Sequence, residues 1–265
     1  MREKTALRFE PMTLGMILDT TFRLYSQNVS LILGITALGY VPYFVAGLLV
    51  VLLGVFYRQT PEAFNASVFA ILAALIPSAL LVLVAYPLST GAATYAIGQR
   101  YLHKPISAVD AMKVTWKRYG TLCWAISTAG VIIMGGFLLL IVPGILWALS
   151  YALLVPVVAL ESGNAKESRR RSWALVAGNR RKVFAVLFIF GLLTSLVSGA
   201  IQAILTFFLE SHSLPGQLTT QLAKEIASFL LAPLPIIASV LLYYDMRIRK
   251  EGFDLEMLSQ ALSQP

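Results

Sequence analysis

Residues 119–160 read YGTLCWAISTAGVIIMGGFLLLIVPGILWALSYALLVPVVAL, a stretch of 42 residues without Asp, Glu, Lys or Arg. About 20 apolar residues in a helix cross the roughly 30 Å hydrocarbon core of a bilayer. The stretch is therefore long enough for two crossings and a turn between them. Pro143-Gly144 is the expected turn, because proline ends a helix and glycine lets the chain reverse.

Four other parts of the chain lack charged residues in the same way. They are residues 24–57, 63–99, 183–209 and 226–244. Hydrophobic residues make up 58% of the chain and charged residues 13%, whereas soluble domains carry about 25% charged residues. A soluble surface needs polar cover that these runs do not provide. The sequence therefore predicts an all-α polytopic membrane protein that forms one integral membrane domain over residues 1–265.

Six transmembrane helices are predicted in this domain. They lie near residues 30–56, 68–98, 121–142, 145–160, 183–208 and 223–244. Residues 1–28 form a cytoplasmic amphipathic lead, and residues 245–265 form a cytoplasmic tail. The sixth helix is needed to keep the basic tail on the same side as the other basic segments.

The basic residues are distributed unevenly along this topology. The lead, the connections after the second and fourth spans, and the tail hold 19 of the 21 Lys and Arg residues. Arg58 and Lys224 fall on the other side. Because short cytoplasmic loops collect Lys and Arg, the pattern predicts that both termini are cytoplasmic.

Three short amphipathic helices are predicted in the cytoplasmic segments, with N-caps at Thr13, Ser107 and Asn164. Asp110 follows Ser107, and Glu167 follows Asn164, at the spacing of a capping box. Each of these helices precedes a span, so a unit of one interfacial helix and two spans occurs three times. Such helices would lie in the membrane interface with the apolar face toward the lipid.

Basic residues next to the membrane attract anionic headgroups, by about 1 kcal/mol for each Lys or Arg. The predicted contacts with anionic lipid or a protein partner are Arg169, Arg170, Arg171, Arg180, Arg181, Lys182, Arg247 and Arg249. The alternative is that these charges only orient the protein in the membrane.

Two carboxylates, Glu161 and Asp245, fall at the inner ends of spans four and six. A carboxylate at this depth is costly unless it is paired. We therefore predict ion pairs between these residues and nearby arginines. In the alternative interpretation, both are exposed interfacial charges that contribute little.

The predicted spans contain few polar residues. Gln202 is the most polar deep residue, and Ser195, Gly199 and Ala203 form a row of small residues beside it. Small residues at this spacing let helices pack closely, so packing is the predicted role of the row, with Gln202 in an interhelical hydrogen bond. Prolines recur in the spans, and broken helices also form the binding sites of transporters. The prolines are Pro42, Pro77, Pro87, Pro156, Pro233 and Pro235.

Catalytic signatures are absent from the sequence. It has no Gly-x-Ser-x-Gly or His-Glu-x-x-His motif, no glycine-rich phosphate loop and one cysteine, Cys123. His103 and His212 are predicted on opposite sides of the membrane. The sequence therefore predicts no enzyme activity, no catalytic residue, no cofactor and no metal. The basic residues are explained by topology, so no nucleic-acid partner is expected.

Three segments carry a family resemblance. They are residues 11–25, the residues from Pro156 through Glu161 and Ser172-Trp173 to Gly178-Asn179, and the ending YYDMRIRKEGFDLE at 243–256. The chain resembles a family of bacterial inner-membrane proteins related to the membrane domain of some glycerophosphoryl diester phosphodiesterases. The resemblance implies a multi-pass protein of the bacterial inner membrane. The catalytic barrel of those enzymes is absent, so the resemblance transfers no activity.

The sequence favours a non-catalytic scaffold or accessory protein that engages anionic lipid or a protein partner at its basic face. Its oligomeric state is not determined by the sequence. The alternative is a transporter or channel for a small or lipid-like solute. A water-accessible cavity lined by Gln202 and the proline-broken segments would favour this alternative, and a solidly packed bundle would favour the scaffold.

Overall fold

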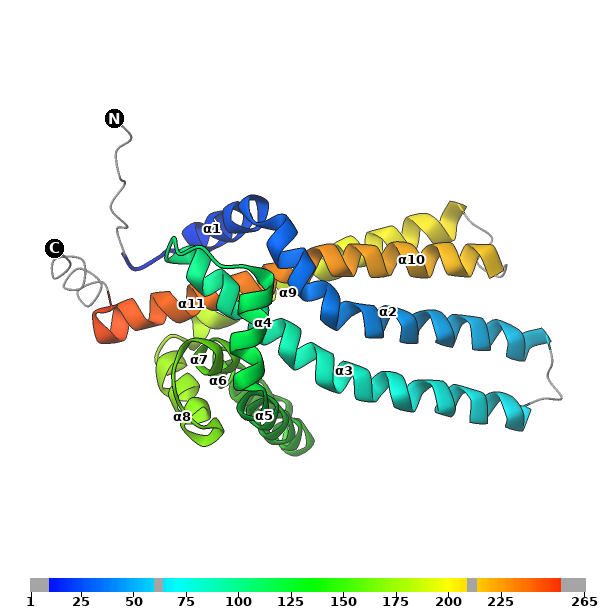
Figure 1. Cartoon of the computed structure of the whole chain (residues 1–265), viewed down its shortest axis with the longest axis horizontal. Helices are drawn as coiled ribbons and strands as arrows, with labels where there is room; N and C mark the ends of the chain where they lie inside the picture. The colour runs from blue at the N-terminus through cyan, green and yellow to red at the C-terminus, as the bar shows by residue number, and fades with distance from the viewer. Residues whose placement is uncertain (1–9, 60–63, 209–213, 254–265) are drawn as a thin grey trace.

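The computed structural model describes residues 10–59, 64–208 and 214–253, with side chains except at 50–51, 53–59, 64–75, 77–80, 82 and 214. The described residues form eleven α-helices and no strand (Figure 1). The helices are α1 (Leu14–Gln27), α2 (Val29–Gln59), α3 (Phe64–Tyr101), α4 (Ala108–Lys117), α5 (Tyr119–Leu139), α6 (Ile141–Ser150), α7 (Leu154–Leu160), α8 (Ala165–Val176), α9 (Arg180–Phe208), α10 (Leu214–Leu231) and α11 (Pro233–Glu251).

Five segments of the described chain are long and apolar enough to cross a membrane. They are Val29–Leu49, Tyr119–Leu139, Ile141–Leu160, Arg180–Phe208 and Pro215–Glu251. The protein is thus an all-helical, multi-pass membrane protein. The second predicted span lies in α3, where many of the outer side chains are outside the described residues, so the count of six spans remains a prediction.

The chain repeats one arrangement three times, in which a short helix precedes a helical hairpin. The short helices are α1, α4 and α8, and each begins at its predicted cap. Thr13 accepts a hydrogen bond from the Met16 amide (3.3 Å), and Ser107 accepts one from the Asp110 amide (3.1 Å). Asn164 and Glu167 form a complete capping box.

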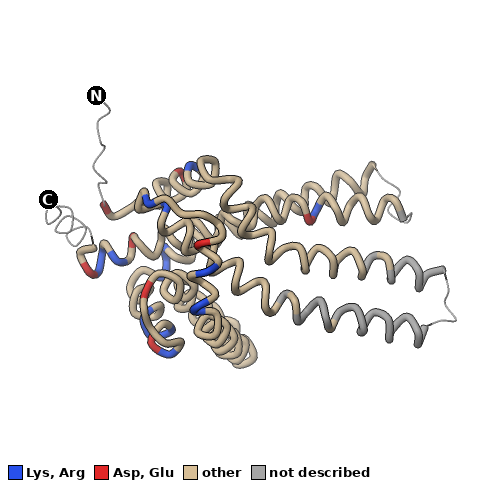
Figure 2. Tube along the Cα trace, in the orientation of Figure 1, with Lys and Arg blue, Asp and Glu red and all other residues tan. Residues whose placement is uncertain are grey.

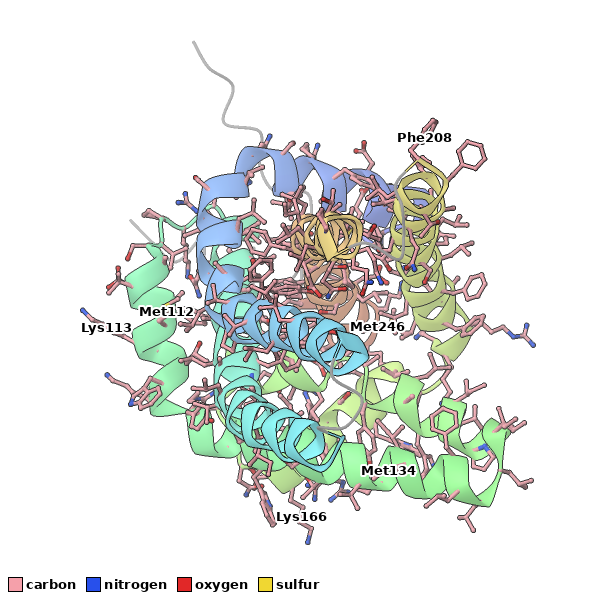
Figure 3. All side chains as sticks on the ribbon, turned by 90° about the vertical axis from the view of Figure 1, so that its right-hand side faces the viewer. Met112, Lys113, Met134, Lys166, Phe208 and Met246 are labelled. Carbon is pink, nitrogen blue, oxygen red and sulfur yellow. The ribbon has the colours of Figure 1, made fainter. Side chains whose placement is uncertain are left out.

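The three hairpins diverge from a common packed end. The α2–α3 and α9–α10 hairpins extend to the right in Figure 1, whereas the shorter α5–α6 hairpin lies toward the bottom of the view and runs in a different direction. The returning arm of each hairpin ends in the packed end, as α3, α7 and α11 respectively. Helix α11 contacts α1, α3, α7, α8 and α9 there. Met246 of α11 lies in the middle of the molecule, while Phe208 projects outward from α9 (Figure 3).

Apolar burial holds this packed end together. The α11 side chains of Ile237, Leu241 and Met246 are fully buried, as are Ala92 and Ala96 of α3. Small residues on α3 let the helices pack closely, and buried aliphatic side chains contribute about 1.5–3 kcal/mol each. The core therefore lies at one end of the molecule, and the outer hairpin arms contribute little to it.

The turn between α5 and α6 differs from the prediction at Pro143-Gly144. The chain reverses at Leu140, which is extended (φ −162°, ψ 153°), and Pro143 and Gly144 lie within the first turn of α6. Proline is accepted there because amides of the first helical turn have no intrahelical partner. Gly144 is needed for close approach, since a Cβ on it would lie 2.6 Å from the Phe137 ring.

The last two spans also differ from their predicted limits. The segment predicted at 145–160 is divided at residues 151–153 into α6 and α7. The segment predicted at 223–244 begins earlier, at α10, and continues through Pro233 into α11. Glu225 is therefore inside the apolar segment Pro215–Glu251 and not at its edge.

Charged residues gather at the packed end of the molecule. Figure 2 shows them over α1, α4, α8, α11 and the ends of the adjoining helices, with an isolated acidic and basic pair on α10. Apart from this pair, the outer arms carry no charge over the residues whose side chains the structure describes. The two ends of the molecule thus differ in both packing and polarity.

Candidate functional site

A cavity of about 570 Å³ lies between the hairpins, beside the packed end. Eleven of its 19 lining residues carry a hydroxyl group, and none is Asp, Glu, Lys, Arg or His. The hydroxyl-bearing residues are Thr36, Tyr40, Tyr86, Ser89, Thr90, Thr94, Thr194, Ser195, Ser198, Ser228 and Ser239. We call this space the central cavity. Its surface is mostly apolar, with hydroxyl groups but no charged side chain among the described lining residues.

All three repeated units form the wall of the central cavity. Helices α2 and α3 provide Tyr40 and Ser89, α9 provides Ser195, and α10 and α11 provide Ser228 and Ser239. The α6–α7 arm supplies the remaining wall, which includes Ala148, Ala152, Val155 and Pro156. The cavity is therefore a product of the whole fold and cannot form within one hairpin.

Five of the eleven hydroxyl groups donate within their own helices, those of Thr36, Ser89, Thr90, Thr194 and Ser239. Thr90 donates to the Tyr86 carbonyl (2.7 Å), and Ser239 donates to the Ile236 carbonyl (2.8 Å). A hydroxyl that donates to its own helix still has lone pairs free to accept. The cavity wall thus offers hydrogen-bond acceptors to a molecule that carries donors.

Thr94 differs from the other hydroxyl-bearing residues of the cavity because it is buried without a partner in the part of the chain that the structure describes. Its side chain is fully buried, and its oxygen has no hydrogen-bond partner among the described residues. A buried polar atom without a partner costs about 1–3 kcal/mol. The oxygen is itself inaccessible to solvent, so Thr94 is a buried polar group behind the surface of the wall.

Two of the predicted helix-breaking prolines lie at the central cavity. Pro156 and Pro235 both line it, close to the starts of α7 and α11. Gly39 of α2 lets this helix pack closely against α3, because a Cβ on Gly39 would lie 2.2 Å from the Ser89 side-chain oxygen. Breaks in two helices and close contact between α2 and α3 therefore shape the space.

The predicted row beside Gln202 is not packed within this chain. Gln202, Gly199 and Ala203 are exposed on α9, and a Cβ on Gly199 would meet no atom within 4 Å. Only Ser195 of this group reaches the central cavity. Helix α10 contacts α9, but it leaves these residues uncovered, so the row is not an interhelical seam of the chain. Gln202 does not line the cavity either.

Asp245 is the centre of the first ionic cluster at the packed end. Its side chain is fully buried and forms ion pairs with Lys182 and with Arg249 (3.1 Å). It also accepts a hydrogen bond from the Met12 amide (2.7 Å), and Arg249 donates to the Met12 carbonyl (3.0 Å). The cluster ties the start of α1 to α9 and α11.

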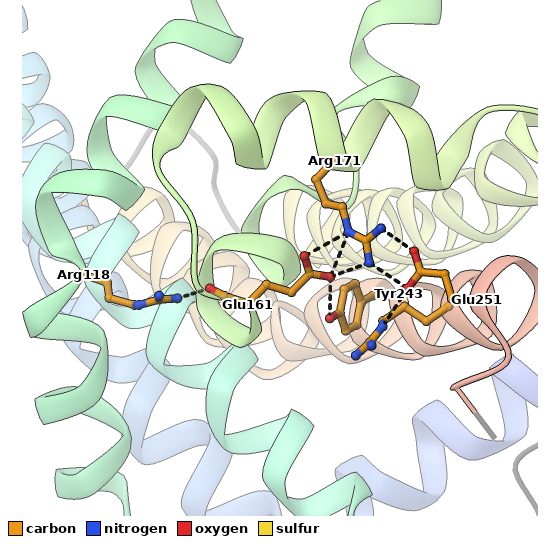
Figure 4. Close-up of polar contacts among 6 residues, drawn as sticks. Arg118, Glu161, Arg171, Tyr243 and Glu251 are labelled. Atoms are coloured by element: carbon orange, nitrogen blue, oxygen red, sulfur yellow. Dashed lines mark hydrogen bonds and ion pairs between the residues drawn. The ribbon is translucent and has the colours of Figure 1, made fainter. Parts of the chain in front are cut away.

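Glu161 and Glu251 are joined by Arg171 in a second cluster (Figure 4). Arg171 lies 3.0 Å from Glu161 and donates to Glu251 at 2.7 Å. Tyr243 donates to Glu161 (2.9 Å), and Arg247 pairs with Glu251 (3.1 Å). The hydrogen bond to Glu251, supported by Glu161, raises the pKa of Arg171 above its ordinary value. Helices α7, α8 and α11 are therefore linked by charge.

The predicted cationic site is divided between these clusters and the surface. Arg171, Lys182, Arg247 and Arg249 are in ion pairs. Arg169 donates to the Thr128 hydroxyl, and Arg180 lies over the Trp173 ring, 5.2 Å from its centroid. Arg170 and Arg181 remain exposed. The i, i+4 spacing of Arg247 with Glu251 and of Arg249 with Asp245 was visible in the sequence. The contacts of Lys182 with Asp245 and of Arg171 with Glu251 join distant segments, so spacing could not predict them.

No group of three or more His, Cys, Asp or Glu side chains that could hold a metal occurs in residues 10–59, 64–208 and 214–253. The central cavity and the two ionic clusters are therefore the polar features that the fold constructs.

Residues 106–246 match a family described as a domain of unknown function, DUF7847. The match covers more than half of the chain, from just before α4 to Met246 of α11, so the chain belongs to this family. No curated protein and no solved structure matches the chain. The likeness to the phosphodiesterase membrane domain remains a prediction.

Proposed function

We propose that the protein binds an uncharged, lipid-like solute in the central cavity and acts as a transporter or carrier for it. The observation that supports this function is a cavity of about 570 Å³ whose described lining residues include eleven with a hydroxyl group and none with a charge. Binding pockets for small molecules commonly have volumes of about 300–1,000 Å³. We place this function ahead of the scaffold that the sequence favours, because Pro156 and Pro235 line the cavity, although Gln202 does not.

The composition of the wall selects the chemistry of the solute. An ion in this cavity would lose water without gaining a counter-ion, which is costly in a low-dielectric site. A neutral molecule with hydroxyl or amide donors can bind the acceptor oxygens. Its apolar part can contact side chains such as Leu187 and Val155. A neutral amphiphile fits both requirements.

The membrane orientation is part of the proposal. The packed end faces the cytoplasm of a bacterial cell, both termini are cytoplasmic, and six spans cross the inner membrane. The gathering of described Lys and Arg residues at this end supports the orientation. Helix α1 packs its apolar face on α11, whereas α4 presents Trp116, which is 61% exposed, to the interface. Cysteine labelling at Lys113 and Lys166 from the cytoplasmic side would test it; labelling from outside would contradict it.

Binding of monooctanoylglycerol to the purified protein in phosphatidylcholine nanodiscs tests the proposed function. We expect saturable binding to the wild type and loss of about tenfold or more in Ser195→Phe, because the ring would fill the cavity. Leu196→Phe is the matched control, since Leu196 is 62% exposed and does not line the cavity. Equal binding by both variants, or equal binding of the phosphorylated analogue, would contradict the proposal.

A second candidate function is contact with anionic lipid at the cytoplasmic face. Lys166, Arg170 and Arg181 are exposed there, and Trp116 stacks on Tyr119 with ring centroids 5.4 Å apart. Aromatic and cationic residues together suit the headgroup region. Retention of phosphatidylglycerol in native mass spectrometry measures this contact.

A further inference from the structure

A second space, outside the central cavity, lies between α2 and α10. It has a volume of about 220 Å³ and is lined by Ala37, Tyr40, Val41, Phe44, Glu225, Ile226 and Phe229. We call it the lateral groove. Glu225 is the only carboxylate among the lining residues that the structure describes, and it is surrounded by aromatic and aliphatic side chains.

Glu225 is buried and only partly satisfied. Glu225 is 9% exposed, and its Oε1 accepts a hydrogen bond from the Gln221 side chain (2.7 Å). Its Oε2 is buried without a hydrogen-bond partner among the described residues. Gly47 of α2 lies against this pair, because a Cβ there would be 3.2 Å from Oε1. Helix α2 therefore closes one side of the carboxyl group. The surface of the groove is almost entirely apolar, so the unmatched oxygen lies behind its wall and must turn into the groove to meet a ligand.

The position of Glu225 makes this unmatched oxygen costly. Glu225 is within the apolar segment Pro215–Glu251, about 16 Å along α10 from its start. Lys224 is the neighbouring cation, but it lies about 100° around the helix and forms no ion pair with Glu225 in the described chain. An intramembrane carboxylate normally has a partner and marks a functional site.

The rest of the lateral groove favours an organic cation as that partner. The rings of Tyr40 and Phe229 have centroids 5.7 Å apart, and Phe44 also lines the groove. Aromatic faces attract ammonium groups, most strongly where water is excluded. A hard metal ion would need several oxygen ligands, whereas this groove supplies one carboxyl group and apolar walls.

We propose that the lateral groove binds a lipophilic ammonium cation, with Glu225 as its counter-ion and with Tyr40 and Phe229 around the charged group. The alkyl part would lie along Val41 and Ile226. The site is separate from the proposed solute site, although Tyr40 lines both spaces. A free alkylamine and the ammonium headgroup of an ethanolamine lipid share this chemistry.

The test uses tritiated n-octylamine and the purified full chain in phosphatidylcholine nanodiscs, with excess unlabelled amine to define saturable binding. We expect Glu225→Gln to weaken saturable binding by about tenfold or more, because a buried charge pair is lost. The glutamine side chain has the same shape and can still contact Gln221. Lys224→Gln should strengthen binding by about two- to threefold, since a nearby like charge is removed.

Two controls make the result specific. Asp19→Asn removes an exposed carboxylate on α1 and should leave binding unchanged. 1-Octanol has the same chain without the charge and should not compete.

Phe229→Leu provides a second variant, with an expected loss of octylamine binding of a few fold. Unchanged amine binding in Glu225→Gln, competition by octanol, or no saturable binding to the wild type would overturn the proposal.

A second experiment distinguishes a lipid headgroup from a free amine as the source of the cation. Nanodiscs with phosphatidylethanolamine should reduce octylamine binding to the wild type if the lipid headgroup reaches the groove, and leave it unchanged if only free amines do. Both results agree with an ammonium site. Binding of monooctanoylglycerol is measured on the same samples, so loss of the central-cavity function is distinguished from loss of this site.

Discussion

The two ends of the molecule solve the same problem, buried polarity, in opposite ways. At the packed end, the fully buried carboxylate of Asp245 is matched by Lys182 and Arg249. In the central cavity, polar groups are uncharged, and Thr94 is left without a described partner. The comparison suggests that the first region is built for rigidity and the second for an incoming molecule.

The largest expected effect is at Asp245. Asp245→Asn leaves Lys182, with 18% of its side chain exposed, without its counter-ion. Removal of one partner of a buried pair costs about 3–5 kcal/mol. We expect a large fall in the unfolding temperature of the purified protein in detergent. Asp19→Asn, at an exposed carboxylate, is the control, and equal unfolding temperatures would contradict the assignment.

Larger side chains should destabilise the packed end more than the central cavity, and this is the second largest expected effect. Ala96 is fully buried in the packed end, so Ala96→Leu should destabilise by about 1–3 kcal/mol through overpacking. Ser195→Leu places similar bulk at the central cavity and should change stability by about 0.5 kcal/mol or less. Thermal unfolding of both variants measures the difference. Similar losses would mean that the cavity is closed in solution.

Arg171 should show an intermediate effect. Arg171→Gln breaks the bridge between Glu161 and Glu251, but its side chain is 32% exposed, and solvent screening reduces the loss to about 1–2 kcal/mol. Arg170→Gln, one residue away and exposed, should be nearly neutral. Equal stabilities by chemical unfolding would show that the cluster in Figure 4 contributes little.

The smallest effect on stability is expected for the exposed cations. The double variant Arg170→Gln, Arg181→Gln should unfold within about 0.5 kcal/mol of the wild type. It should nevertheless retain less phosphatidylglycerol in native mass spectrometry, because each cation contributes about 1 kcal/mol to headgroup binding. The matched double change to Lys keeps the charge. Unchanged lipid retention would leave these residues only an orienting role.

Sequence reasoning was most successful where the signal was local. Charge-free runs predicted the helices, and cap residues such as Thr13 and Asn164 predicted where the short helices begin. The Leu140 turn was wrongly placed at Pro143-Gly144 because a proline in the first turn of a helix has the same local signal as one in a loop.

The features that depend on contacts between distant segments were not predictable in this way. The Ser and Thr residues of the central cavity come from five helices, and only the fold brings Ser89 near Ser195 and Ser228. Glu225 looked like the polar border of a span because Lys224 precedes it. The i, i+4 spacing of Gln221 and Glu225 was the available signal for a helix that continues outward.

The turn at Leu140 has a consequence for biogenesis. Its amide donates to Gly136 (3.0 Å), and its carbonyl accepts from Gly144 (3.3 Å), so the backbone of Leu140 is satisfied within the chain. The first amides of α6 have no side-chain cap. Leu138, Leu139, Ile141 and Val142 surround it with side chains at least 66% exposed. In the proposed topology, the first and third hairpins carry Arg58 and Glu210 across the membrane. The second hairpin has no charged residue at its turn, so it can enter the lipid as one apolar unit without moving a charged loop across the membrane.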